Sequence, residues 1–156
     1  MRKCGECSLC CKLIEVRELS KPAGANCPHR AEIGCSLYGT EKMLDCCLLY
    51  SCMWLLLDRI PDELRPDRCR VIFEKIDDRT FIGISDPAFP GAWRMGIAAD
   101  FIRLLMKQGA SAVIAEGTTK NVLPVAGRSE QSIFDAIGDR IRKDEEKWRL
   151  RLTQQT

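Results

Sequence analysis

The stretch Cys4-Gly5-Glu6-Cys7-Ser8-Leu9-Cys10-Cys11 places four thiols within eight residues, near the start of the chain. Nine of the ten cysteines of this 156-residue chain lie between Cys4 and Cys52, and only Cys69 stands apart. Such crowding indicates either disulfide cross-links or metal binding. The choice between them decides which functions can be considered.

A disulfide framework requires an oxidising compartment. The N-terminal residues include no apolar segment of the kind found in signal peptides, and no apolar run approaches the length of about 18 residues needed to cross a membrane. We therefore expect a cytoplasmic protein without membrane association. Thiols stay reduced there, and this spacing predicts metal ligands. A disulfide scaffold and ordinary buried cysteines, which behave as small hydrophobes, are the alternatives.

The Cys-x-x-Cys spacing is the one by which a chain gives two thiolates to one metal ion. Three cysteines at this spacing match the opening of the bacterial iron–sulfur run, but only in part, because Cys11 follows Cys10 directly and the one Cys-Pro pair comes later, at Cys27. If the segment were helical, Cys4, Cys7 and Cys11 would share one face. An almost all-thiolate ligand set suits both structural zinc and iron–sulfur centres.

The remaining composition narrows the range of functions. The chain has 24 basic and 22 acidic residues, spread evenly, so nucleic-acid binding has little electrostatic support. His29 is the only histidine, and we favour a polar loop role for it over a role as a ligand. No phosphate loop, dinucleotide fingerprint, nucleophile elbow or zinc-protease motif is present, so no catalytic residue is predicted.

The fold class expected is α+β, with two parts that could also form one integrated domain. Residues 1–60 form a cysteine-rich metal-binding region of short helices and loops, in which 41–58 is predicted to be helical. Because this region is too short for a large apolar core, bound metal would supply much of its stability.

Residues 61–156 are predicted to form a small α+β unit that packs against the cysteine region. Strands at 70–74 and 81–84 would form one hairpin, and strands at 112–115 and 121–125 a second, turning at 116–119. An amphipathic helix is expected at 96–108, ended by Gly109, and another from a cap at Ser129 to about residue 149.

The cysteine pattern resembles the CxxCxxCC (YkgJ-like) family, whose members are described as zinc- or iron-chelating proteins. Its members continue with a further cysteine, then a Gly-Cys-x-x-Tyr-like element, then a cysteine followed by Cys-x-Trp. These elements resemble Cys27, the stretch 34–38, Cys47 and the stretch 52–54. The resemblance covers roughly the first 70 residues. It implies eight metal ligands: Cys4, Cys7, Cys10, Cys11, Cys27, Cys35, Cys47 and Cys52.

The chain departs from the family pattern at several positions. Arg30 stands where relatives have a cysteine after the histidine, and the Arg-Pro pair that often precedes the third cluster is missing. Cys46 is an extra thiol beside Cys47, so either could be the ligand; the family-like spacing to Cys52 favours Cys47. Cys69 is interpreted as a buried structural cysteine.

The expected function is therefore a metal-binding protein that chelates zinc or iron, including as an iron–sulfur cluster, with the metal ion as its partner. A metal chaperone or buffer is one variant of this reading. The alternative is a redox or methyl-transfer enzyme component, because some larger members of the family resemble flagellin lysine N-methylases. A shared cysteine motif does not carry that activity over, since fold and cluster do not determine chemistry.

Overall fold

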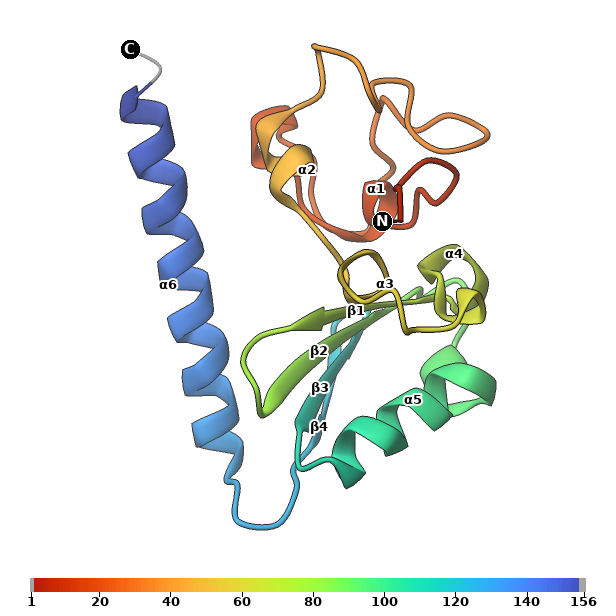
Figure 1. Cartoon of the computed structure of the whole chain (residues 1–156), viewed down its shortest axis with the longest axis vertical. Helices are drawn as coiled ribbons and strands as arrows, with labels where there is room; N and C mark the ends of the chain where they lie inside the picture. The colour runs from red at the N-terminus through yellow and green to blue at the C-terminus, as the bar shows by residue number, and fades with distance from the viewer. Residues whose placement is uncertain (1, 155–156) are drawn as a thin grey trace.

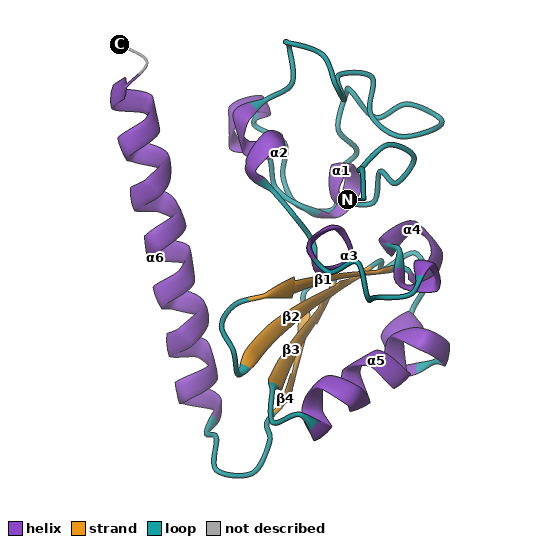
Figure 2. Ribbon diagram, viewed as in Figure 1, coloured by secondary structure: helices purple, strands orange, loops and turns teal. Residues whose placement is uncertain are grey.

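The computed structural model describes residues 2–154, with the side chains of this range except those of Trp148 and residues 151–154. The fold is α+β, as predicted: a mixed four-stranded sheet with helices on both faces and a loop-rich cysteine segment at one end (Figures 1 and 2). The short helices of the first part are α1 (Cys10–Leu13), η1 (Arg17–Leu19), α2 (Asp45–Leu49), α3 (Met53–Leu56), η2 (Asp62–Leu64) and α4 (Pro66–Cys69). The rest comprises β1 (Val71–Lys75), β2 (Thr80–Ser85), η3 (Ala92–Arg94), α5 (Gly96–Lys107), β3 (Ser111–Glu116), β4 (Thr119–Leu123) and α6 (Glu130–Gln154).

The sheet follows chain order, β1-β2-β3-β4, and both predicted hairpins are present as antiparallel pairs. Strands β2 and β3 pair in parallel, because the crossover through α5 brings the chain back to the same end of the sheet. The second turn is tighter than predicted. Glu116 pairs with Thr119, so β4 starts at Thr119 and only Gly117 and Thr118 form the loop, with Gly117 at a φ of 59°.

The two long helices cover opposite faces of the sheet. Phe101 of α5 meets Phe73 of β1 edge-to-face, with ring centroids 5.1 Å apart. The predicted end of α5 is confirmed, because Gly109 follows it in the left-handed region. On the other face, Ile133 of α6 is fully buried and the Ser129 hydroxyl accepts a hydrogen bond from the Ser132 amide at 3.2 Å, as an N-cap does.

Beyond the sheet, α6 continues alongside the cysteine region, separated from it for most of its length in the view of Figure 1. It extends to Gln154, further than predicted. A contact between the Arg17 guanidinium and the Glu145 carboxylate, at 3.4 Å, links the two segments. Within residues 2–154, none of the helices combines the length and apolar character needed to span a membrane.

The helix prediction for the cysteine region was wrong. Residues 41–58 do not form one helix: α2 ends at Leu49, the chain is extended at Tyr50 and Cys52, and α3 starts at Met53. The break lets the Tyr50 hydroxyl reach Glu74 while Cys52 and Met53 enter the core, so tertiary packing overrides helix propensity here. At the N-terminus, helix α1 begins only at Cys10, and residues 4–8 are loop.

One hydrophobic cluster joins the cysteine region to the sheet. Leu9, Leu13 and Trp54 lie in the same cluster as Val71 and Phe73. Polar contacts reinforce this docking. The Lys12 ammonium lies 2.6 Å from the Asp86 carboxylate, which is 2% exposed, and Arg65 pairs with Glu6 at 2.8 Å. Arg2 donates to the carbonyls of Trp54, Leu57 and Ile60 and stacks on the Trp54 ring.

Candidate metal centre

All ten cysteines are free thiols. Cys27, Cys52 and Cys69 are buried, and the others are half-buried. Among residues 2–154, no three histidine, cysteine, aspartate or glutamate side chains are arranged to hold a metal ion. The eight predicted ligands instead fall into two sets of neighbouring thiols, which meet at the Cys10–Cys11 pair on α1.

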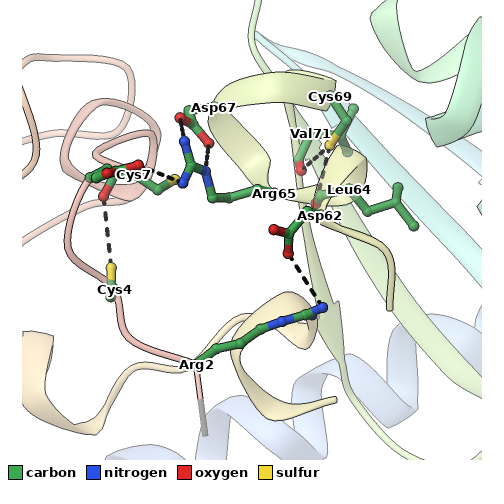
Figure 3. Close-up of polar contacts among 10 residues, drawn as sticks. Arg2, Cys4, Cys7, Asp62, Leu64, Arg65, Asp67, Cys69 and Val71 are labelled. Atoms are coloured by element: carbon green, nitrogen blue, oxygen red, sulfur yellow. Dashed lines mark hydrogen bonds and ion pairs between the residues drawn. The ribbon is translucent and has the colours of Figure 1, made fainter. Parts of the chain in front are cut away.

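The first set, here called the inner thiols, consists of Cys4, Cys7, Cys10 and Cys52. The Cys4 Sγ donates to the Cys7 carbonyl at 3.7 Å (Figure 3), and the Cys4 and Cys10 thiols are hydrogen-bonded to each other. Cys7 and Cys52 both lie within electrostatic reach of Cys4. Cys7 and Cys10 pack against the hydrophobic cluster to which Cys52 belongs, so this set lies on the core.

The second set, here called the outer thiols, consists of Cys11, Cys27, Cys35 and Cys47. The Cys11 and Cys35 thiols are hydrogen-bonded, and Cys47 lies within electrostatic reach of the other three. The backbone brings the segments together: the Cys27 amide donates to the Cys11 carbonyl at 2.8 Å. None of these four described residues is part of the hydrophobic cluster on the sheet, although Cys27 is buried.

The turn that carries Cys35 rests directly on the N-terminal loop. Gly34 has a φ of 75°, and a Cβ added to it would lie 1.9 Å from the Gly5 carbonyl oxygen. The amide of Ala31 donates to the Gly34 carbonyl at 3.1 Å, which closes the turn between Cys27 and Cys35. The absence of a side chain at residue 34 therefore allows the turn of the outer thiols to approach the loop of the inner thiols.

Burial and hydrogen bonding shift the thiol pKa values, and a hydrogen bond lowers the pKa of one thiol while it raises that of the other. Hydrogen bonding from Cys10 lowers the pKa of Cys11 to about 6, with smaller contributions from the Cys35 thiol and from the cationic Arg30 and Lys21. The same hydrogen bond, donated by Cys10, raises the pKa of Cys10 itself. Desolvation raises the pKa of Cys7 to about 12. Because the thiolate is the metal-binding form, the lowered pKa favours Cys11 as a ligand at neutral pH.

Cys46 and Cys47 are adjacent on α2 but have different neighbours. The sulfurs of Cys46 and Cys47 are 3.8 Å apart. Cys46 interacts with Glu18, and burial, followed by the charge of Cys47, raises its pKa to about 12. Cys47 instead faces the other outer thiols. This placement supports Cys47 over Cys46 as the candidate ligand.

Cys69 and His29 are not members of either set. The Cys69 thiol is buried, donates to the carbonyls of Val71 at 3.2 Å and Leu64 at 3.5 Å (Figure 3), and has a pKa raised by burial to about 11. These contacts fit its interpretation as a structural cysteine. His29 offers its backbone carbonyl to the amide of Ser36 at 2.9 Å, which helps to shape the turn before Cys35.

Two cations beside the outer thiols were not predicted from the sequence. Arg30 donates to the Ser8 hydroxyl at 3.2 Å and to the Asn26 side chain at 2.8 Å. Lys21 is 5% exposed, and its ammonium donates to the backbone carbonyls of Lys12, Ile14 and Pro22. In the sequence, Arg30 and Lys21 cannot be distinguished from ordinary surface cations. Only the fold brings them close to Cys11.

Comparison with known proteins adds no assignment: neither family models, nor curated proteins, nor solved structures match this chain. The resemblance to the cysteine-motif family therefore stays a prediction drawn from the motif.

Proposed function

We propose that this chain is a metal-binding protein that holds zinc or iron, including iron in an iron–sulfur cluster, through its cysteine cluster. The observation that carries the proposal is that eight free thiols, from four separate stretches of loop and short helix, each lie within electrostatic reach of at least one other. Thiolate ligands are characteristic of both structural zinc and iron–sulfur sites. The candidate ligands are Cys4, Cys7, Cys10, Cys11, Cys27, Cys35, Cys47 and Cys52.

The surroundings of the thiols also support a bound cation. Residues 14–44 contain one short helix and two isolated bridges but no strand or long helix, so they have little regular structure to hold them in place. In small loop-rich segments of this kind, the free energy of metal binding contributes directly to folding. Burial and the charges of neighbouring thiolates raise the pKa of Cys47. A bound metal ion would offset both effects, because its positive charge stabilises the thiolates.

The redox or methyl-transfer alternative rests on the family resemblance alone. A metal-binding role requires only the thiols described above, whether the metal ion is structural or is passed on to another protein. We therefore put forward metal binding as the function and leave catalysis outside the proposal.

The test is metal analysis together with an absorption spectrum on protein purified without oxygen. Zinc without visible colour, or iron with acid-labile sulfide and a brown colour, would each support the proposal and would identify the metal. Protein that is folded, has ten reactive thiols and carries no transition metal, even after incubation with Zn²⁺ or with iron and sulfide, would contradict it. Cys69→Ser provides the control, because this thiol lies outside both sets and its loss should leave metal content unchanged.

A further inference from the structure

We infer that one exposed face of helix α6 binds the same face of a second copy of this chain, with the two helices antiparallel. The face, here called the α6 stripe, consists of Phe134, Ile137 and Ile141. It lies outside both sets of thiols, so the inference is independent of the proposed metal-binding function. The chain would then associate into a homodimer through α6.

Much of α6 lies away from the sheet. Ile133 in the first turn is fully buried, whereas residues 139–144 are all exposed. Figure 1 shows the helix continuing beyond the sheet beside the cysteine region, and the contact between Arg17 and Glu145 that links the two joins exposed side chains. Because helices in proteins gain most of their stability from the packing of an apolar face, α6 retains a face that a partner can cover.

The α6 stripe adjoins the side of the helix that packs on the sheet. Side chains of an α-helix point about 100° apart per residue, so Phe134, Ile137 and Ile141 fall within a strip about 60° wide. Ile133 points about 100° away from Phe134. Phe134 is 38% exposed and Ile141 is 52% exposed, while Ile137 is half-buried between the stripe and the sheet. Apolar side chains aligned at this spacing are typical of helices that pack against another helix.

The charges of α6 are separated along its length. Residues 130–139 include three acidic side chains and no basic one, whereas residues 140–150 include five basic and three acidic side chains. Antiparallel copies place the acidic half of each helix beside the basic half of the other. Parallel copies would place like charges together and align the two helix dipoles, which is unfavourable. Charge complementarity therefore selects the antiparallel arrangement.

The separation is clearest at the two ends of the helix. In the middle, Arg140 pairs with Asp144 at 2.7 Å, within the same helix. Glu130 lies one turn before Phe134 and points about 40° from it, so it extends the stripe at the acidic end. In an antiparallel pair centred near Ile141, Glu130 of one copy lies beside the last turns of the other helix, where the sequence is basic. A two-fold symmetric contact forms this favourable arrangement twice.

The same charges make other occupants of the stripe less suitable. A nucleic acid or an anionic membrane would attract the basic half of α6 but would be repelled by the acidic half. A second copy matches both halves. Because a single pair of helices forms a small interface, we expect reversible association of the weak, transient kind.

The experiment measures the mass of the full chain, as purified, by analytical ultracentrifugation at increasing concentration. A reductant is present throughout, so that disulfides between copies cannot imitate a dimer. The chain has a mass of 17.6 kDa, and we expect the average mass to rise toward twice this value. A mass that stays at that of the monomer up to about 1 mM would overturn the inference.

Ile141→Gln tests the stripe, with Leu104→Gln as its matched control. The two side chains are exposed to a similar degree, 52% and 50%, but Leu104 lies on α5. We expect Ile141→Gln to raise the Kd of the dimer at least about tenfold and Leu104→Gln to leave it unchanged. Circular dichroism checks that both variants are folded. Equal effects of the two substitutions would overturn the assignment of this face.

Glu130→Lys tests the orientation of the two helices. In an antiparallel dimer it places a cation beside the basic half of the partner, so association should weaken. In a parallel dimer it would remove repulsion between two copies of Glu130, and stronger association would overturn the antiparallel arrangement. Glu63→Lys makes the same change of charge at an exposed residue of η2 and should have no effect. Metal content should be unchanged in all these variants, so failure of this inference leaves the proposed function intact.

Discussion

At the scale of single residues, small steric and directional differences decide which thiols meet. Cys10 and Cys11 are neighbours on α1, and the hydrogen bond between their thiols lowers the pKa of Cys11 and raises that of Cys10. Gly34 acts through sterics, since it has no side chain to keep the Cys35 turn away from Gly5. Neither effect requires a large hydrophobic contact.

Gly34→Ala tests this close approach, with Gly39→Ala as its control. Both glycines have a positive φ, 75° and 77°, but a Cβ at residue 39 would meet nothing within 4 Å. The control should therefore cost about 1–2 kcal/mol through the left-handed backbone alone. Gly34→Ala should cost a further ~1–3 kcal/mol through overpacking, and should reduce zinc content. Urea unfolding and metal analysis measure both effects, and equal costs for the two variants would argue against the contact.

At the scale of elements, the break between α2 and α3 connects the cysteine region to the sheet. Tyr50 lies in the break and donates its hydroxyl to Glu74 of β1 at 2.6 Å. Burial raises the pKa of Glu74, and the hydrogen bond from Tyr50 only partly offsets this effect. A buried carboxylate of this kind costs stability when it is ionised.

Glu74→Gln should therefore change how stability depends on pH. Because the pKa of Glu74 is higher in the folded than in the unfolded chain, the folded state favours the protonated form. Its contribution to stability is fully present below the ordinary value of 4.5 and is lost as pH rises through the raised folded pKa. We expect a higher melting temperature for the Gln variant than for the parent at pH 7, and a difference that shrinks as pH falls toward 4.5.

The control for this pH effect is Asp78→Asn. Asp78 is exposed, and Lys75 lowers its pKa through a hydrogen bond of 2.6 Å, so its ionised form is the favoured one in the folded chain. Neutralising Asp78 should not raise the melting temperature at pH 7. If the Glu74→Gln variant melted below the parent at neutral pH, the buried carboxylate would be shown to stabilise the link between Tyr50 and β1.

At the scale of the whole molecule, the cysteine region and the sheet are joined by a shared core and by a few ion pairs. The most buried of these pairs joins Lys12, which directly follows the Cys10–Cys11 pair, to Asp86 after β2. Asp86 also accepts a hydrogen bond from the Ala88 amide at 3.0 Å. The Lys12–Asp86 pair therefore links α1 to the end of the sheet.

Lys12→Met should strongly destabilise the chain, because it leaves the Asp86 carboxylate buried without its cation. We expect a loss of about 3 kcal/mol in the free energy of unfolding. Lys75→Met removes the exposed partner of Asp78 and should have little effect on the free energy of unfolding. Chemical denaturation of both variants measures the difference. The double variant Lys12→Met, Asp86→Asn should recover part of the loss, and equal costs for the two single variants would contradict this account.

Taken alone, the sequence determined the elements that depend on local pattern. The alternating strands around residues 77–79, the apolar face of α5 with Gly109 after it, and the Ser129 cap of α6 are all local features, and all are present. The same reasoning failed for residues 41–58, where the apolar pattern allowed one helix but the bond from Tyr50 to Glu74 and the burial of Met53 require two. Local propensities are weak compared with such packing.

The cysteine motif marked the eight candidate thiols from the sequence, but only the tertiary structure divided them into an inner and an outer set. The placement of both sets depends on contacts between segments distant in sequence, such as the Cys27 amide on the Cys11 carbonyl and Gly34 on Gly5. Spacing along a chain specifies which thiols a short turn can bring together, whereas the approach of separate loops depends on backbone contacts between segments that only the folded chain brings together.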